Sequence, residues 1–292
     1  MFRTGSELRV LRGVLVFVLS VVALMVLGAP MQDAWGMLGL ALTELMLLAI
    51  AIFSVHRFRW DWKEVFPLDI PTFRQVWGVV VFWFASYLAV YVTTMILFYF
   101  FPGGMGEVST ALTGFFTSVP RPLALLVVAV LPGLCEEVLH RGLILYTLQG
   151  KSKWLTILVM ALIFGFFHLD LYRFVGTALL GGSLTYVMLK TNNLVLPILL
   201  HVLNNAVTAS LAFMDGTDGG PAYIPLSAVG SALVLASVAP FLFVQGSRLL
   251  RNTEGEHQRG VTKRTRVVTS LLALLFLLVG TLLIAKSTAT AP

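Results

Sequence analysis

Most of this chain consists of apolar blocks about as long as a membrane is thick. A helix needs roughly 20 residues to cross the hydrocarbon core of a bilayer, and nearly all of the apolar residues fall into segments of about that length. Of the 292 residues, 58% are hydrophobic and 12% are charged, and the mean hydropathy is +0.91. A soluble domain carries about a quarter charged residues, so this composition excludes one. The sequence predicts an all-α polytopic membrane protein, a bundle of eight or nine transmembrane helices forming a single membrane domain over residues 1–292.

Helix-breaking residues divide the apolar sequence into nine predicted helices. These helices cover residues 11–29, 35–56, 74–101, 121–149, 153–169, 173–190, 193–213, 225–250 and 266–286. The breakers are Ala29-Pro30, Phe101-Pro102-Gly103-Gly104, Gly150, Asn192-Asn193 and the stretch from Asp215 to Pro221. The segment from Val108 to Val119 is too short to span, and we expect it to lie at the interface or to re-enter the membrane. Residues 251–292 are predicted to form a cytoplasmic basic loop and an accessory C-terminal helix.

The basic residues predict the orientation of the bundle. With a cytoplasmic N-terminus, 16 of the 20 Lys and Arg residues fall in inside segments, and Arg121, Arg173 and Lys286 fall outside. This asymmetry follows the positive-inside rule. The net charge of +6 is then explained by anionic lipid headgroups. We therefore expect membrane lipids and no nucleic acid among the partners, and a multi-pass protein of the plasma membrane of a prokaryote.

Ionisable residues are concentrated in three of the predicted helices. An ionised side chain at the bilayer centre costs roughly 2.5–3.5 kcal/mol on insertion scales, so such a cluster indicates a shared polar site. We expect the three helices to face each other around an intramembrane cavity, open to the cytoplasm and laterally to lipid. Glu44, in the second helix, is predicted to be a packed polar contact. The clustered residues are Glu136, Glu137, His140 and Arg141 in the fourth helix, His168 in the fifth, and His201, Asn204 and Asn205 in the seventh.

The spacing of these residues suggests hydrolysis. Residues four apart share a helix face, so Glu137 lies beside Arg141, and His201 lies beside Asn205. The arginine can keep one glutamate ionised, while desolvation can leave the other poised to act as a base. A glutamate that deprotonates water makes a nucleophile, and a protonated histidine or an asparagine amide can stabilise the resulting oxyanion. A glutamate and two neutral histidines could instead bind a zinc ion that activates the water. The sequence leaves both mechanisms open.

Three motifs in order carry a family resemblance. Residues 136–141 read EExxxR, residues 164–168 read FxxxH, and residues 201–205 read HxxxN. In this order on separate hydrophobic segments, they resemble the CAAX-processing and bacteriocin-processing intramembrane protease family, which includes the type II CAAX prenyl endopeptidases. The resemblance covers residues 120–215, the predicted catalytic core.

The resemblance implies a role for each residue of the cluster. Glu136 would activate water, His168 and His201 would complete the catalytic cluster, and Asn205 would help to hold the oxyanion. Glu137 and Arg141 would orient and tune that centre. If the enzyme uses zinc, the ligands would be Glu136, His168 and His201; a metal-free glutamate mechanism is equally compatible with the sequence.

The function that follows is an intramembrane endopeptidase. We expect it to cleave near the C-terminus of a membrane-anchored or prenylated protein or peptide. Two alternatives remain: a non-catalytic membrane scaffold or bacteriocin-immunity protein, and a proton-coupled transporter, which is less favoured because the sequence has no internal repeat. Each motif taken alone also has a structural explanation. Glu137 and Arg141 could form an ion pair that joins helices, and His201 and Asn205 could form interhelical hydrogen bonds.

Overall fold

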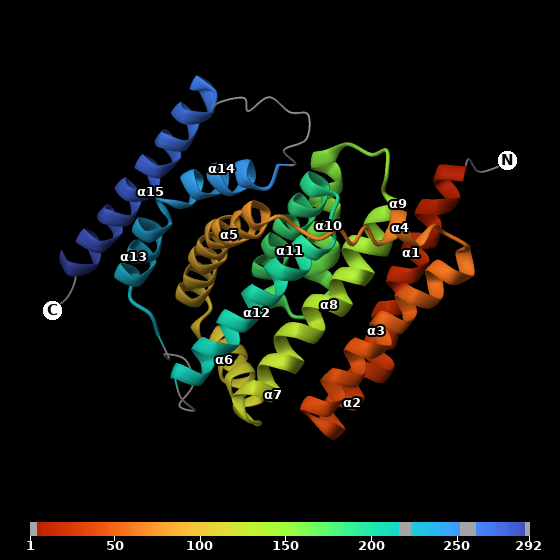
Figure 1. Ribbon diagram of the computed structural model, residues 1–292. Coiled ribbons are helices and arrows are strands. Elements are labelled where there is room, and N and C mark those ends of the chain that lie inside the picture. Colours follow the sequence, from red (N-terminus) through yellow and green to blue (C-terminus); the bar gives the residue numbers. More distant parts are fainter. Residues whose placement is uncertain (1–4, 216–222, 252–260, 290–292) are drawn as a thin grey trace.

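The computed structural model describes residues 5–215, 223–251 and 261–289, and in these residues it contains helices and no strand (Figure 1). In chain order the elements are α1 (Gly5–Ala23), the π-helical turn η1 (Leu24–Gly28), α2 (Ala29–Trp35), α3 (Met37–Phe58), α4 (Trp62–Val65), α5 (Phe73–Phe100), α6 (Pro102–Thr117), α7 (Arg121–Leu125), η2 (Leu126–Val130), α8 (Leu131–Glu137), η3 (Val138–Ile144), α9 (Leu145–Thr147), α10 (Lys153–Phe167), α11 (Leu171–Thr191), α12 (Val195–Asp215), α13 (Leu226–Ala236), α14 (Ala239–Leu249) and α15 (Lys263–Ala289).

Seven helical stretches in the described residues are long and apolar enough to cross a membrane. They are Gly5–Trp35, Met37–Phe58, Phe73–Phe100, Arg121–Thr147, Val195–Met214, Leu226–Leu249 and Lys263–Ala289. The remaining two predicted segments are also helical: α10 is apolar but has only 15 residues, and α11 has 21. The predicted fold class is thus confirmed, and the chain is an integral multi-pass membrane protein.

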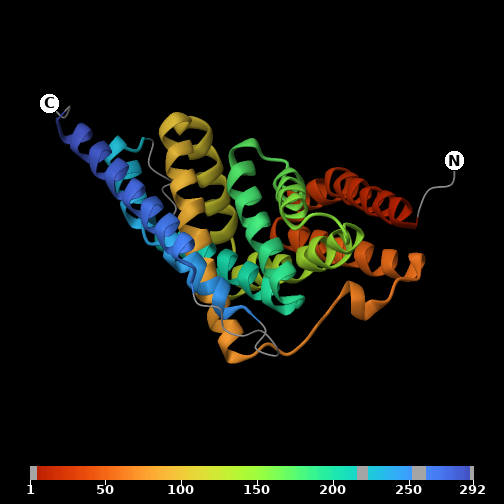
Figure 2. The same ribbon diagram turned by 90° about the horizontal axis from the view of Figure 1, so that it is seen from above.

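The helices form an elongated bundle with the two ends of the chain at opposite edges (Figures 1 and 2). α1 and α3 lie at one edge, α13 and α15 at the other, and the stretch from α7 to α9 runs between them. Of the most apolar window in Arg121–Thr147, 56% is buried, against 17% in each of the edge helices Gly5–Trp35 and Lys263–Ala289. The helix that carries Glu136, Glu137 and Arg141 therefore lies at the centre, and the two most apolar helices face lipid.

One predicted breaker does not break its helix. The helix predicted to end at Ala29-Pro30 continues from Gly5 to Trp35, and the chain turns only at Gly36, whose φ is 54°. A proline removes one backbone donor and crowds the carbonyl four residues earlier. The π-helical turn η1 ends two residues before Pro30, and we infer that its wider backbone relieves this crowding. The predicted boundary was wrong because a π-helical turn leaves no mark in composition.

Of the other predicted helix boundaries, some agree with the structure and some do not. α5 ends before Pro102, and Asn192 ends α11 in the left-handed conformation, as predicted. Residues 108–119 overlap α6, a 16-residue helix next to α5. The predicted helix 225–250 corresponds to the span Leu226–Leu249, but it is not continuous: two turn residues, Ser237 and Val238, separate α13 from α14, which has Pro240 in its first turn. The predicted turn at 216–221 and most of the basic loop lie outside the described residues.

Close helix approaches at small residues hold the central helices together. A Cβ atom at Gly133 of α8 would lie 2.5 Å from Cγ2 of Val202 on α12, and one at Gly181 of α11 would lie 2.7 Å from Cβ of Phe164 on α10. No larger side chain fits at either glycine without a shift of its neighbour. These contacts bring the polar positions of α8, α10 and α12 within side-chain reach of one another.

The C-terminal helix is packed against the bundle in the same way. A Cβ atom at Gly280 of α15 would lie 2.6 Å from the carbonyl oxygen of Gly230 on α13, and the reciprocal distance is also 2.6 Å. We expect Gly280→Ala to lower the free energy of unfolding by about 1–3 kcal/mol through overpacking. Gly114→Ala is the matched control, because a Cβ there meets nothing within 4 Å and alanine is the better helix former by about 1 kcal/mol. Unfolding monitored by tryptophan fluorescence in detergent compares the two, and equal effects would show that α15 does not dock on α13.

Candidate active site

The carboxylate of Glu137 joins two of the three predicted motifs. Its Oε1 atom accepts a hydrogen bond from Nη1 of Arg141 at 2.7 Å and another from Nδ1 of His201 at 2.8 Å. Glu137 and Arg141 lie one turn apart at the junction of α8 and η3, and His201 comes from α12. All three side chains are buried. The expected contact between the fourth and seventh predicted helices is therefore present.

Arg141 extends the network to α11 and α10. Its Nη2 donates to the carbonyl oxygen of Gly181 at 2.9 Å. Its guanidinium carbon lies 4.3 Å from the centroid of the Phe164 ring, a cation–π contact. A lysine could not make these contacts together, because it lacks the planar fork of donors. Arg141 thus fixes the position of Glu137 relative to two further helices.

The ring of Phe164 packs against the rings of three histidines. Its centroid lies 4.9 Å from that of His168, 5.2 Å from His140 and 5.7 Å from His201, all in edge-on arrangements. The FxxxH motif therefore supplies two rings that pack together, Phe164 and His168. His168 is brought to the same site as His201 and Glu137, as the motifs predicted.

The hydrogen bonds of the histidines define which ring nitrogens remain available. Nδ1 of His168 lies 2.8 Å from the carbonyl oxygen of Phe164, and Nδ1 of His201 lies 2.8 Å from the Glu137 carboxylate. Carbonyl and carboxylate oxygens only accept hydrogen bonds, so each Nδ1 carries the proton. In the neutral ring, Nε2 of both residues then carries a lone pair. A carboxylate behind a histidine in this way orients the ring and favours its protonation.

Glu136 differs from Glu137 in that its carboxylate accepts no hydrogen bond in the described residues. It is 8% exposed, and its Oε2 atom is buried with no hydrogen-bond partner in the described residues. The charges of His201, Glu137, Arg141 and Arg173 all act on its carboxyl group. Of the two adjacent glutamates, one is fixed by two donors and the other remains free to react.

Asn205 is attached to the helix that carries the glutamates. Its Nδ2 donates to the carbonyl oxygen of Val128 at 3.1 Å. In a regular helix that carbonyl would accept from the residue four positions on, but that residue is Pro132, which has no N–H. Asn205 supplies the missing donor and keeps one further amide N–H. Asn204 donates to Oδ1 of Asn205 at 3.3 Å and so helps to set the orientation of this amide.

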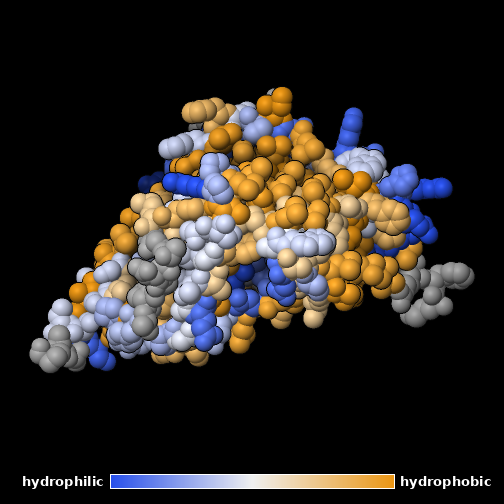
Figure 3. Space-filling view, turned by 90° about the horizontal axis from the view of Figure 1, so that it is seen from below, coloured by the Kyte–Doolittle hydropathy of each residue, from blue (hydrophilic) through white to orange (hydrophobic). Residues whose placement is uncertain are grey.

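The turn between α10 and α11 forms one wall of the site. The 15 residues of α10 extend about 22 Å, which is less than the roughly 30 Å hydrocarbon core. Irregular backbone within the membrane is tolerated only where it is covered by protein or lines a water-filled cavity. Leu169, in this turn, has a φ of 52°, and His168 and Asp170 flank it. Figure 3 shows the face at the lower side of Figure 1, which is hollowed near its centre, with hydrophilic side chains in the hollow.

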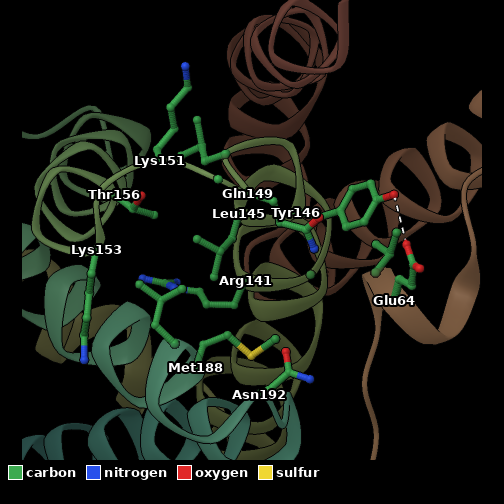
Figure 4. Close-up of a pocket in the computed structure, with 15 residues that line it drawn as sticks. Glu64, Arg141, Leu145, Tyr146, Gln149, Lys151, Lys153, Thr156, Met188 and Asn192 are labelled. Carbon is green, nitrogen blue, oxygen red and sulfur yellow. Dashed lines mark hydrogen bonds between the residues drawn. The ribbon is translucent and has the colours of Figure 1, made fainter. Parts of the chain in front are cut away.

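A separate cavity of about 290 Å³ lies at the other end of the central helix, next to Lys151 and Lys153. Figure 4 shows Arg141 extending across it and Tyr146 donating its hydroxyl to Glu64 at 3.3 Å. Its lining includes Arg141 but neither of the two glutamates. This cavity approaches the back of the Glu137–Arg141 pair, and a cytoplasmic opening to Glu136 stays a prediction.

The side chains as placed do not fit a zinc ion. In the part of the chain that the structure describes, no three His, Cys, Asp or Glu side chains are grouped so that they could hold one metal ion together. Glu136, His168 and His201 share the site but not a common point, and we derive no catalytic step through a metal. The zinc site stays a prediction from the sequence.

Two contributors to the site were not predicted. The carbonyl of Gly181 is a backbone group, so residue identity gives no signal for it. Glu44 on α3 was predicted to be a packed polar contact rather than part of the site; it is 3% exposed, its Oε2 has no partner in the described residues, and the charge of Glu136 acts on it. The sequence feature that could have indicated a role for Glu44 near the site was an acidic residue in the middle of an apolar helix.

Residues 117–207 match the model of a family described as type II CAAX prenyl endopeptidase Rce1-like. The match covers about a third of the chain and includes all six predicted site residues, from Glu136 to Asn205. It confirms the resemblance predicted from the motifs, and at family level it supports a CAAX-type intramembrane endopeptidase. No curated protein and no solved structure gave a match.

The ion pair of Glu137 and Arg141 gives a stability prediction. Removing one partner of a buried pair destabilises by about 3–5 kcal/mol, because the other charge is left uncompensated. We expect Arg141→Met to lower the free energy of unfolding by that amount. The double variant Glu137→Gln/Arg141→Met should lose less than the sum of the two single changes. Denaturant unfolding in detergent measures the cycle, and strictly additive losses would mean that the two side chains do not interact.

Proposed function

We propose that this chain is an intramembrane endopeptidase that hydrolyses a peptide bond near the C-terminus of a membrane-anchored or prenylated protein or peptide. The observation that carries the proposal is the contrast between the adjacent glutamates. Glu137 is held through its Oε1 atom by Arg141 and His201, whereas neither carboxylate oxygen of Glu136 accepts a hydrogen bond in the described residues; the Oε2 atom of each glutamate is buried without a partner. A structural ion pair needs only Glu137 and would not require a second, unpartnered acid beside it.

The reaction begins with proton transfer to Glu136. Its carboxylate takes a proton from a water molecule, and the water oxygen attacks the carbonyl carbon of the scissile peptide bond. The carbonyl π electrons move onto oxygen and give a tetrahedral oxyanion. When the oxyanion collapses, the C–N bond breaks, and the proton held by Glu136 passes to the leaving nitrogen. The products are a carboxylic acid and an amine, with Glu136 returned to its starting state.

The neighbouring polar groups stabilise the developing charge. Glu137 accepts from Nδ1 of His201 and so orients that ring, and in the imidazolium form its Nε2–H can donate to the oxyanion. Asn205 contributes its second amide N–H, because the first is bound to Val128. His168 faces the same cluster through Phe164 and is placed to orient the water or the substrate carbonyl. Arg141 and Glu137 act as positioning residues.

The substrate class follows from where the site lies. Glu136, Glu137, Arg141, His201 and Asn205 lie on helices long and apolar enough to cross the membrane, and we infer that the hydrophilic hollow in Figure 3 opens to this site. An extended C-terminal segment can enter such a hollow while its apolar or prenyl anchor remains in lipid. The matched family takes its name from prenylated substrates, and we extend the class to other C-terminal segments held at the membrane.

We expect Glu136→Gln to lower kcat/KM by at least about 100-fold, because general base catalysis contributes 10²–10⁴-fold, while leaving the thermal unfolding unchanged or slightly improved. The assay uses a library of fluorogenic lipid-anchored and transmembrane C-terminal peptides in liposomes. Glu107→Gln, a change of the same chemistry at an exposed position of α6, is the matched control and should retain activity.

Two further results of this assay decide between alternatives. Loss of cleavage on adding a chelator, restored by zinc, would establish the metalloenzyme; cleavage that resists the chelator would favour the metal-free glutamate. If the folded wild type cleaves no peptide of the library, the endopeptidase is contradicted and a scaffold or immunity protein becomes the better account.

A further inference from the structure

Arg173 occupies a fixed position at the start of α11, five residues after His168. The Asp170 carboxylate caps this helix, with Oδ1 accepting from the backbone N–H of Tyr172 at 2.9 Å and of Arg173 at 3.1 Å. The cap and the turn at Leu169 together fix the first turn of α11 against the end of α10. The position of the Arg173 side chain is thus tied to the wall of the proposed active site.

The guanidinium of Arg173 has no bonded partner. Within residues 5–215, 223–251 and 261–289, none of its nitrogens makes a hydrogen bond or an ion pair within 4.0 Å, although the residue is partly buried. Its charge nevertheless acts on the Glu136 carboxyl and on His168, and the charge of Asp170 acts on it. Arg173 therefore lies in the first turn of α11, five residues after His168, and no carboxylate of the described residues neutralises it within 4.0 Å.

This distinguishes it from the other arginine of the site. Arg141 uses Nη1 on Glu137 and Nη2 on Gly181 and lies over Phe164, so both ends of its guanidinium fork have a structural role. Arg173 is partly buried, and a charged group removed from water is costly unless an anion or water meets it. Asp170 already uses one oxygen on the helix N-terminus. The planar fork of donors on Arg173 is left to bind a group that is not part of this fold.

We propose that Arg173 binds the C-terminal carboxylate of the peptide substrate and thereby sets how far from the C-terminus the enzyme cleaves. This inference rests on the proposed endopeptidase function and names the subsite that confers its specificity. A guanidinium binds a carboxylate through two parallel hydrogen bonds, with a geometry that a carboxamide cannot reproduce. Because each extended residue adds at most about 3.6 Å, a fixed anchor beside Glu136 selects a bond a few residues from the end of the chain.

The test compares two lipid-anchored peptides that differ only at the C-terminus, one ending in a carboxylate and one in a carboxamide. For the wild type we expect kcat/KM to fall by about 10- to 100-fold on amidation, which is the range for a hydrogen bond to a charged group. For Arg173→Gln we expect the acid peptide to fall to the level of the amide, so that discrimination is lost. Arg173→Lys should retain part of it. Arg121→Gln, at an exposed arginine of α7, is the control and should discriminate as the wild type does.

Binding separates this inference from the proposed function. In a Glu136→Gln background, the Kd of each fluorescent peptide is measured in nanodiscs, with no need for cleavage. Tighter binding of the acid, lost with Arg173→Gln, supports the subsite. Equal cleavage and equal binding of acid and amide by the wild type would overturn it while leaving the endopeptidase intact. If the wild type cleaves neither peptide and binds both equally, the proposed function and the subsite fail together.

Discussion

One carboxylate oxygen, Oε1 of Glu137, accepts hydrogen bonds from both Arg141 and His201. A carboxylate buried in a membrane helix is tolerated only when donors surround it, so this pair of bonds fixes how the central helices pack. Arg141 lies on the same helix as Glu137, and His201 lies on α12. The close contact between α8 and α12 at Gly133 and Val202 keeps His201 within reach. The polar network and the glycine contact therefore support each other.

The same constraint explains the irregular backbone around the site. α10 has 15 residues, fewer than the roughly 20 that cross the hydrocarbon core, and it ends at the turn that carries His168. Pro132 leaves the Val128 carbonyl without a helical donor, and Asn205 fills that role. Each irregularity exposes polar backbone that the protein satisfies with a side chain or with a hollow that water can enter. The clustered polar side chains thus lie where regular helix geometry is interrupted.

Much of the fold and of the candidate site could be predicted from the sequence, because ionisable residues are rare in membrane-spanning helices and stand out where they occur. The apolar blocks predicted the helices, and the few ionisable residues within them predicted which helices meet. The motif order further identified His168 and His201 as parts of one site. The predicted ends at Ala29-Pro30 and the unbroken helix 225–250 were wrong, because whether a proline ends a helix depends on backbone relief and packing that sequence does not encode locally. The backbone carbonyl of Gly181 could not be predicted, because residue identity gives no signal for a backbone contact. Arg173 was predicted to lie in an outside segment, and its partial burial could not be predicted because it depends on how the start of α11 packs.

Two adjacent glutamates have different roles: Glu137 holds the helices together, and Glu136 is the reacting group. Unfolding measurements test this difference without any substrate. Glu136→Gln and Glu137→Gln are compared in the same detergent by denaturant unfolding. The account predicts that Glu137→Gln destabilises the protein, since Arg141 loses its charged partner, and that Glu136→Gln is neutral or stabilising, since it removes an unpartnered buried acid. Equal destabilisation by both changes would contradict it, because Glu136 would then be a structural anchor like its neighbour.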